Sequence, residues 1–403
     1  MAVGGLLSNP SIAQTWLPTT APTNTAWQAV SSSADGTRLF AIGRSYVYAT
    51  STNSGATWTT NTEPQIGSEY GTWNCNASSA DGNTLLAMNG DAAWISTNSG
   101  VSWSSNTVPT ANFWSAVALS ADGKKAVAVD GGPSGDGGPG GIYVSTNSGM
   151  AWNEMFAPSN TWSSVASSAD GTILSAAVLV DSLPTVPVYV STNSGTAWTP
   201  TASPTNMQCT AIASSADGRK LIVAGFEAQG TGAGMVYTST NSGSTWISNT
   251  VSLFARWSSV ASSADGTTLA AVSEYGTIYT STNSGTIWNS NSVPLLSWLS
   301  VASSADGAKL AATGVDIYFH GGIYTFQSTP SPQLNFQPSG TNLNFSWLIP
   351  STNFVLRQNL DLTTANWSAV TNPPMLNLTN LQKSDHAAHV RPQCLLQARN
   401  PVM

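Results

Sequence analysis

The chain has 403 residues, of which only 8% are charged, and its formal net charge is −7. Phosphate binding requires clustered lysine and arginine, so we expect no nucleic acid as a partner, and no apolar run approaches the ~20 residues of a membrane span. Sixteen tryptophans argue against disorder, because disordered chains are poor in large apolar side chains.

The N-terminus, MAVGGLLSNPSIAQ, lacks the basic region and the long apolar core of a secretory signal peptide. Ser, Thr, Asn and Gly fill most polar positions of the chain, a composition that suits the exposed strands and turns of an extracytoplasmic protein. Either a signal has been removed from this chain or the protein stays inside the cell.

From Trp27 onward one motif, W-x-x-V-A-S-S-A-D-G in its clearest form, recurs along the chain. Its Asp-Gly pairs begin at Asp35, Asp81, Asp122, Asp170, Asp217, Asp265 and Asp306. A tryptophan lies eight residues before each of these Asp residues, except in the fifth copy, where Cys209 replaces it. A period of roughly 41 to 49 residues that carries an aromatic and a glycine turn is the signature of a propeller or a solenoid.

A second motif, S-T-N-S-G-x-x-W, interleaves with the first and occurs six times. It begins at Ser51, Ser96, Ser145, Ser191, Ser239 and Ser281. In the copy that starts at Trp257, four short strands are predicted: WSSVASS, TTLAAVS, GTIYTST and TIWNSNS. Ala-Asp-Gly forms the hairpin turn between the first two, where Gly supplies the positive φ. Four strands repeated radially make a propeller blade, so the predicted fold class is all-β, a seven-bladed β-propeller.

The seventh repeat ends at Phe326 without a copy of the second motif. A segment of matching pattern, Gln14-Thr-Trp16, precedes the first repeat at the interval that separates Trp246 from Trp257. The N-terminal strand is therefore predicted to complete the last blade and close the ring. We expect the regularly spaced aromatic residues to pack between neighbouring sheets, because regular burial explains regular spacing.

Residues 1–327 are thus assigned to the propeller. Pro330 and Pro332 interrupt the pattern, and the alternation from Leu334 to Val370 predicts a small β module over residues 328–382. Residues 383–403 change abruptly in composition, and the sequence supports no structural prediction for them.

Cysteine and histidine give little support to metal or redox chemistry. Cys75, Cys209 and Cys394 are too few and too scattered for a disulfide framework or a zinc site, so buried free thiols are expected. In the tail, His386, His389 and Cys394 have a spacing only loosely like that of metal ligands. No cofactor is predicted, with calcium as the alternative, and any metal site is unassigned.

The S-T-N-S-G-x-x-W element resembles the Asp-box of sialidase-like (BNR-repeat) β-propellers, whose pattern is S/T-x-D-x-G-x-x-W. The resemblance covers residues 10–326 and implies a structural role, in which the box residue holds the turn and the Trp packs between sheets. These roles fall to Asn53, Asn98, Asn147, Asn193, Asn241 and Asn283, and to Trp58, Trp103, Trp152, Trp198, Trp246 and Trp288. Asn replaces the family's Asp in every copy, which keeps the acceptor oxygen but removes the charge. The C-terminal module resembles those of repeat-rich bacterial surface proteins, which implies a secreted or cell-surface location in a bacterium.

The catalytic groups of sialidases are not found by a residue-by-residue search. Of the arginines, only Arg44 and Arg256 fall in loops on the side where that family places its active site, so an arginine triad cannot be assembled. We therefore predict a non-enzymatic binding or surface-interaction propeller. One alternative is a glycosidase-like enzyme with two loop carboxylates, which requires an acid and a base about 5–9.5 Å apart. Another is an assembly factor similar to the photosystem II assembly and stability factors.

Of the twelve acidic residues that lie outside the repeated turns, nine fall in loops on one side of the predicted propeller. Those loops also vary most in length, and variable loops on a rigid scaffold usually carry function. The predicted ligand-binding residues are Glu63, Glu69, Tyr70, Asp91, Phe113, Asp130, Asp181, Glu227, Arg256, Glu274, Tyr275, Asp316 and Tyr318. A glycan or another protein is the expected ligand, and the protein is expected to be a monomer. A purely solubilising role of the acidic loops is the alternative.

Overall fold

The computed structural model describes residues 16–45, 47–61, 73–90, 92–108, 113–131, 140–179, 187–228, 232–252, 255–274 and 276–327. It also describes seven strands between residues 335 and 399. Compact packing divides the chain at residue 327. Residues 14–327 form one unit, and residues 328–403 belong to the other, so each is treated by itself.

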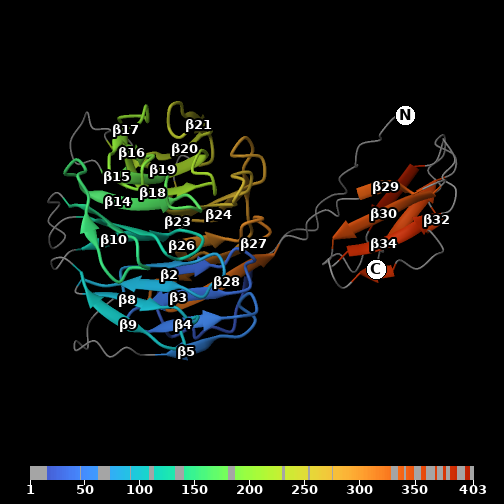
Figure 1. The fold of residues 1–403 in the computed structure, drawn as a ribbon, viewed down its shortest axis with the longest axis horizontal. Helices are drawn as coiled ribbons and strands as arrows, with labels where there is room; N and C mark the ends of the chain where they lie inside the picture. The colour runs from blue at the N-terminus through green and yellow to red at the C-terminus, as the bar shows by residue number, and fades with distance from the viewer. Residues whose placement is uncertain are drawn as a thin grey trace. The chain divides into compact units, whose positions relative to one another are not determined.

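The larger unit consists of seven four-stranded antiparallel sheets, and in six of them the strands follow one another in sequence order (Figure 1). Blade 1 contains β2 (Trp27–Ser32), β3 (Leu39–Gly43), β4 (Tyr48–Ser51) and β5 (Thr59–Asn61). Blade 2 contains β6 (Cys75–Ser78), β7 (Leu85–Met88), β8 (Ala92–Ser96) and β9 (Ser104–Thr107). Blade 3 contains β10 (Trp114–Leu119), β11 (Ala126–Asp130), β12 (Ile142–Ser145) and β13 (Asn153–Glu154). Blades 4 and 5 contain β14 (Trp162–Ser167), β15 (Leu174–Val178), β16 (Val188–Ser191) and β17 (Thr199–Pro200); β18 (Met207–Ser214), β19 (Leu221–Glu227), β20 (Gly234–Ser239) and β21 (Ile247–Asn249). Blade 6 contains β22 (Arg256–Ser262), β23 (Leu269–Glu274), β24 (Ile278–Ser281) and β25 (Asn289–Ser290). The predicted all-β, seven-bladed propeller is confirmed.

Blade 7 joins the two ends of the propeller sequence. Its strands lie in the order β1 (Leu17–Pro18), β28 (Gly321–Gln327), β27 (Lys309–Val315) and β26 (Ser297–Ser303). In this sheet Leu17 pairs with Thr325. The predicted closure of the last blade by the N-terminal strand is therefore confirmed.

A closed ring of backbone hydrogen bonds links all seven blades at their Ala-Asp-Gly turns. In each blade the alanine N–H donates to the carbonyl oxygen of the equivalent alanine in the next blade, over 2.7–2.9 Å. The ring runs from Ala34 through Ala80, Ala121, Ala169, Ala216, Ala264 and Ala305, which donates back to Ala34. The small side chain of alanine lets adjacent turns approach closely. The repeated Ala-Asp-Gly sequence therefore forms the hairpin turn and also the hydrogen bonds that close the ring.

Hydrophobic cores form between neighbouring blades. The described residues contain seven such clusters, one for each pair of adjacent blades, including the pair of blades 7 and 1. The tryptophans at the blade starts are buried in these cores. Trp114, for example, meets the edge of Tyr143 with ring centroids 5.1 Å apart. In the core between blades 4 and 5, Cys209 and the buried Met207 occur where other blades have the Trp.

Within the described residues, Cys75 and Cys209 are free and buried. Burial raises the pKa of both thiols, that of Cys209 to about 12. These thiols therefore behave as small apolar side chains rather than as nucleophiles. Cys394 lies outside the described residues.

The second unit contains two antiparallel sheets. One has the order β29 (Asn335–Ser339), β30 (Asn342–Leu348), β34 (Gln382–Ala387) and β33 (Met375–Asn377), and the other has β32 (Ser368–Ala369), β31 (Val355–Asn359) and β35 (Leu395–Arg399). Most of β34 and all of β35 fall within residues 383–403, for which the sequence supported no structural prediction. In the described part of the chain, no helix is long and apolar enough to cross a membrane.

Candidate functional site: the loop face of the propeller

The connections within and between blades leave the propeller on two opposite sides. The turn face consists of the Asp-Gly turns and the S-T-N-S-G boxes, and the loop face consists of the connections between second and third strands and between successive blades. In six blades the third residue after the box serine donates its backbone N–H to the Asp-Gly turn, as Ser54 does to the carbonyl of Thr37 over 2.8 Å. The two kinds of turn therefore lie together on one face.

The aspartates of the turn face are used to build their own turns. The hydroxyl of Ser168 donates to Asp170 Oδ1 over 2.6 Å, and the backbone N–H of Thr172 donates to the same oxygen over 2.9 Å. These hydrogen bonds lower the pKa of Asp170 to about 2, with that from Ser168 contributing most. Serine and aspartate pair in the same way in all seven blades. The carboxylates of these aspartates are therefore engaged in the hydrogen bonds that hold their own turns.

The asparagines of the boxes close a second set of turns. Asn283 Oδ1 accepts the hydroxyl of Ser281 over 2.9 Å and the backbone N–H of Ile287 over 2.8 Å. The equivalent bond from the N–H four residues on is present in all six boxes. Ser284 and Gly285 both have positive φ, as do the equivalent pairs in the other boxes. The neutral amide thus supplies the acceptor that this tight turn requires.

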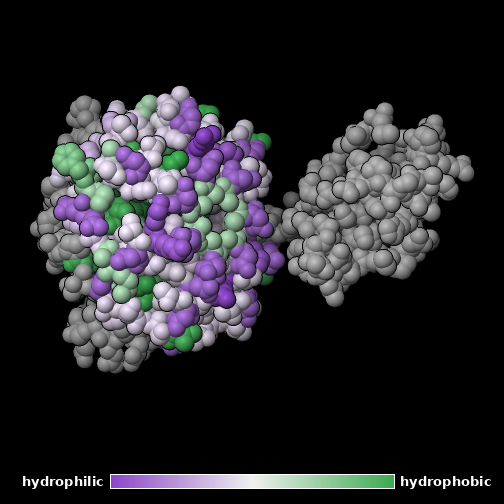
Figure 2. Space-filling view, in the orientation of Figure 1, coloured by the Kyte–Doolittle hydropathy of each residue, from purple (hydrophilic) through white to green (hydrophobic). Residues whose placement is uncertain are grey.

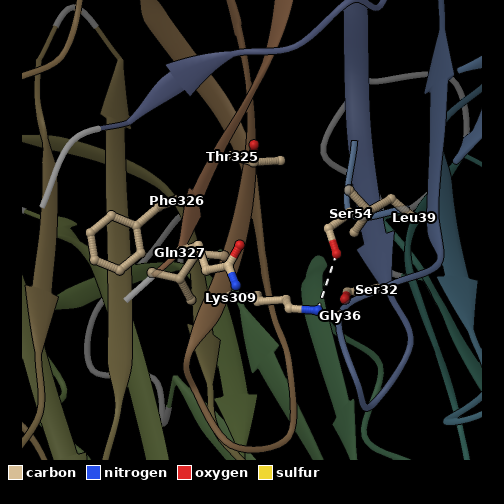
Figure 3. Close-up of a pocket in the computed structure, with 9 residues that line it drawn as sticks. Ser32, Gly36, Leu39, Ser54, Lys309, Thr325, Phe326 and Gln327 are labelled. Carbon is tan, nitrogen blue, oxygen red and sulfur yellow. Dashed lines mark hydrogen bonds between the residues drawn. The ribbon is translucent and has the colours of Figure 1, made fainter. Parts of the chain in front are cut away.

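Basic side chains of the turn face link one blade to the next. Lys309 of blade 7 reaches blade 1, where its Nζ donates over 3.1 Å to Ser54 Oγ (Figure 3). The same Nζ donates over 3.1 Å to the carbonyl oxygen of Asp35. The aliphatic part of the lysine lies against Gly36, where an added Cβ would come within 2.8 Å of Cδ. Arg38 makes the equivalent bridge from blade 1 to Ser99 of blade 2. Lys125 and Lys220 lie in the same way against the turn glycines of the next blades. A small hollow between blades 7 and 1 is lined by this lysine and by Leu39.

Seven of the thirteen predicted ligand-binding residues are described by the structure, and these belong to the loop face. The other six lie outside the described residues: Glu63, Glu69, Tyr70, Asp91, Asp181 and Tyr275. Phe113 is exposed just before β10. Asp130 is the last residue of β11 and is only 4% exposed, so it is not available at the surface.

A first group of loop-face residues lies on blades 5 and 6. Arg256 and Glu274 are opposite each other at the ends of β22 and β23. The guanidinium of Arg256 lies 6.0 Å from the ring centroid of Phe226 in the neighbouring blade, at the outer limit of a cation–π contact. Glu227 follows this phenylalanine at the end of β19. The structure thus brings together three predicted residues, and the sequence analysis did not identify Phe226.

A second group is presented by the loop between β27 and β28. Asp316 Oδ1 accepts the backbone N–H groups of Tyr318 and His320, each over 2.8 Å, and its Oδ2 lies 3.3 Å from the imidazole Nδ1 of His320. Burial by itself would raise the pKa of Asp316, but these hydrogen bonds outweigh it and lower the pKa. Phe319 has a φ of 61°, which is rare for an aromatic residue. The carboxylate therefore fixes the shape of the loop.

The same loop contacts blade 1 at the seam where the ring closes. The guanidinium of Arg44 lies 4.5 Å from the ring centroid of Phe319. The N–H of Arg44 donates to the carbonyl oxygen of Ala26, and the N–H of Gly321 donates to that of Thr23. The sequence analysis predicted Asp316 and Tyr318, but it missed Phe319 and the contact with Arg44. The run Ile-Tyr-Phe inside a loop was the available signal.

Ile317, Tyr318 and Phe319 are 78%, 72% and 55% exposed. Figure 2 shows how hydrophobic residues lie scattered among hydrophilic ones on the visible side of the propeller. Isolated exposed hydrophobic residues of this kind are normal on a soluble protein. Three consecutive ones in a loop held in a fixed shape are a candidate contact surface.

No protein-family model matches the chain, and no curated protein matches it in sequence. Solved structures do match its fold. YCF48 bound to D1 peptide gives a TM-score of 0.58 at 14% identity, over 81% of this chain and 100% of that one. YCF48 from Cyanidioschyzon merolae gives 0.59 at 15% identity, over 78% and 99%. The GH74 enzyme of Niastella koreensis gives 0.59 at 13% identity, over 89% of this chain and 60% of the enzyme.

What is shared is the propeller fold. At these identities the similarity extends to the fold alone. The propeller implied by the Asp-box resemblance is confirmed, and membership of the sialidase-like family stays a prediction.

Proposed function

We propose that this protein is a non-enzymatic binding propeller that takes up a segment of another protein on its loop face. The observation that carries the proposal is the contrast between the two faces. Aspartate, asparagine and lysine side chains of the turn face are engaged in turns and in links between blades. On the loop face, Ile317 and Tyr318 are held out into solvent.

The similarity to a YCF48 that is bound to a peptide supports a protein ligand. It shows that a propeller of this overall shape can hold a peptide, and the whole of that chain is matched by this one. The assembly-factor alternative is a special case of this proposal.

The glycosidase alternative has less support from the geometry. A pair of catalytic carboxylates must face each other across the substrate. Among the described loop-face acids, Asp316 is bound within its own loop and Asp130 is buried. Glu227 and Glu274 are half-buried at the ends of β19 and β23, and Glu274 lies opposite Arg256. The surroundings of Asp130 and Asp316 thus give this alternative no support.

A selection experiment tests the proposal. The immobilised protein is screened in parallel against a displayed library of random peptides and against a glycan array. The peptide that binds most tightly is then studied by hydrogen exchange. We expect selected peptides and slower exchange at residues 113–116 and 316–320, with unchanged exchange in the boxes. Binding of glycans alone, or protection confined to the turn face, would overturn the proposal.

A further inference from the structure

Within the proposed function, we infer that the loop from Asp316 to His320 is the anchor of the binding surface and that its partner is a basic protein segment with apolar side chains. The inference rests on three features of the loop: exposed apolar surface, a fixed conformation and the charge around it.

The apolar surface has no intramolecular cover for most of its area. Ile317 and Tyr318 are each more than two-thirds exposed, and Phe319 is half exposed although Arg44 lies over its ring. Exposure of apolar side chains of this size to water is unfavourable, and the free energy falls when a partner covers them. Tyrosine is also among the residues that most often dominate binding energies.

The conformation of the loop is fixed before any partner arrives. Two backbone N–H groups are held by Asp316 Oδ1, and the N–H of Asp316 itself donates to the carbonyl oxygen of His320 over 2.9 Å. The positive φ of Phe319 is unfavourable for a residue with a side chain, so the hydrogen bonds of the loop must hold it in place. Because the loop is already ordered, it loses less conformational entropy when a partner binds.

Charge selects a basic partner. The described residues of the loop face include two arginines, Arg44 and Arg256, each with its guanidinium near a phenylalanine ring. They also include three partly exposed acids, Glu227, Glu274 and Asp316, so carboxylates outnumber guanidiniums there. A lysine or arginine of the partner gains from these charges and from the exposed ring of Tyr318 through a cation–π contact. An acidic segment would be repelled.

Two synthetic peptides serve as probes. In one, arginine and leucine alternate, and in the other glutamate replaces every arginine. Titration of the full-length protein should show binding of the first peptide, weakened as salt rises, and at least tenfold weaker binding of the second. Equal binding of the two peptides would overturn the inference.

Matched variants locate the anchor. Tyr318→Ala should weaken binding about tenfold or more, as expected for an aromatic anchor, whereas Tyr318→Phe keeps the ring and should bind nearly as wild type. Only the backbone of Tyr318 takes part in the loop hydrogen bonds, so both variants should keep the melting temperature. Phe156→Ala is the control, because Phe156 is a 95% exposed aromatic residue of the same face that lies between β13 and β14, in the connection of blades 3 and 4, across the ring from blade 7.

The outcomes separate this inference from the proposed function. If the arginine peptide still protects the loop face from exchange in the Tyr318→Ala variant with unchanged affinity, the anchor is wrong and the binding propeller stands. If Tyr318→Ala instead abolishes a concentration-dependent dimer seen by sedimentation, the surface belongs to a second copy of the chain and the inference is wrong.

Discussion

Removal of the Trp16 side chain tests how much the N-terminal strand contributes to ring closure. Trp16 is 4% exposed in the core between blades 6 and 7, and its ring centroid lies 5.5 Å from that of Phe326. A buried tryptophan covers about 150–250 Å², which at about 25 cal/mol per Å² corresponds to roughly 4–6 kcal/mol. Measured truncations of buried aromatic residues cost about 3–5 kcal/mol. We therefore expect Trp16→Ala to lower the free energy of unfolding by about 4 kcal/mol.

Leu17→Ala is the matched control. Leu17 is the next residue, is 61% exposed and is the first residue of β1, and its truncation leaves the backbone pairing with β28 in place. Thermal unfolding followed by tryptophan fluorescence should give a melting temperature roughly 5–8 °C lower for Trp16→Ala. The control should stay within about 1 °C of wild type. Equal melting temperatures for the two variants would refute closure by this strand as a source of stability.

The remaining predictions concern the turn face. Hydrogen bonds place the folded pKa of Asp170 at about 2, below its unfolded value of 3.8. The resulting stability is complete above the unfolded pKa and is lost as pH falls through the folded pKa. The melting temperature should therefore drop between about pH 4 and pH 2, less steeply in Asp170→Asn, and a flat profile would contradict this. Asn283→Ala removes the acceptor for Ile287 N–H and should cost about 1 kcal/mol in urea unfolding; Asn283→Asp should cost less, and the reverse order would count against the turn-making role. Lys309→Met keeps the aliphatic contact with Gly36 and loses only one exposed and one partly buried hydrogen bond, so it should cost under about 1 kcal/mol. Lys309→Ala should cost more, and equal losses would show that the packed stem contributes nothing.

Much of the propeller could be predicted because the relevant information is local in the sequence. Alternating apolar residues define each strand, and Asp-Gly and Ser-Gly supply the positive φ of each turn. Counting the copies of the two motifs shows that the seventh repeat lacks its last strand. It also shows that one additional strand lies before Trp27. The sequence therefore determined the number of blades and the way in which the ring closes.

Contacts between blades could not be predicted in this way, because they join residues that are distant in the chain. The ring of alanine hydrogen bonds and the bridge from Lys309 to Ser54 depend on the approach of neighbouring turns in space. Nothing local in the sequence indicates a partner for the basic residues that follow the Asp-Gly turns. Tertiary structure gave them a role as links between blades.

In the candidate site, too, the sequence identified what depends on residue type and position, and it missed what depends on contacts between distant segments. The sequence identified Asp316 and Tyr318 because acids and aromatic residues in variable loops are recognisable by type and position. It missed Phe319 and its contact with Arg44, because these residues come from opposite ends of the propeller sequence and meet only when the ring closes. It placed Asp130 on the binding surface, whereas packing at the end of β11 buries it. Residue type and periodicity fix local structure, but exposure and partners are decided by which segments the closed ring brings side by side.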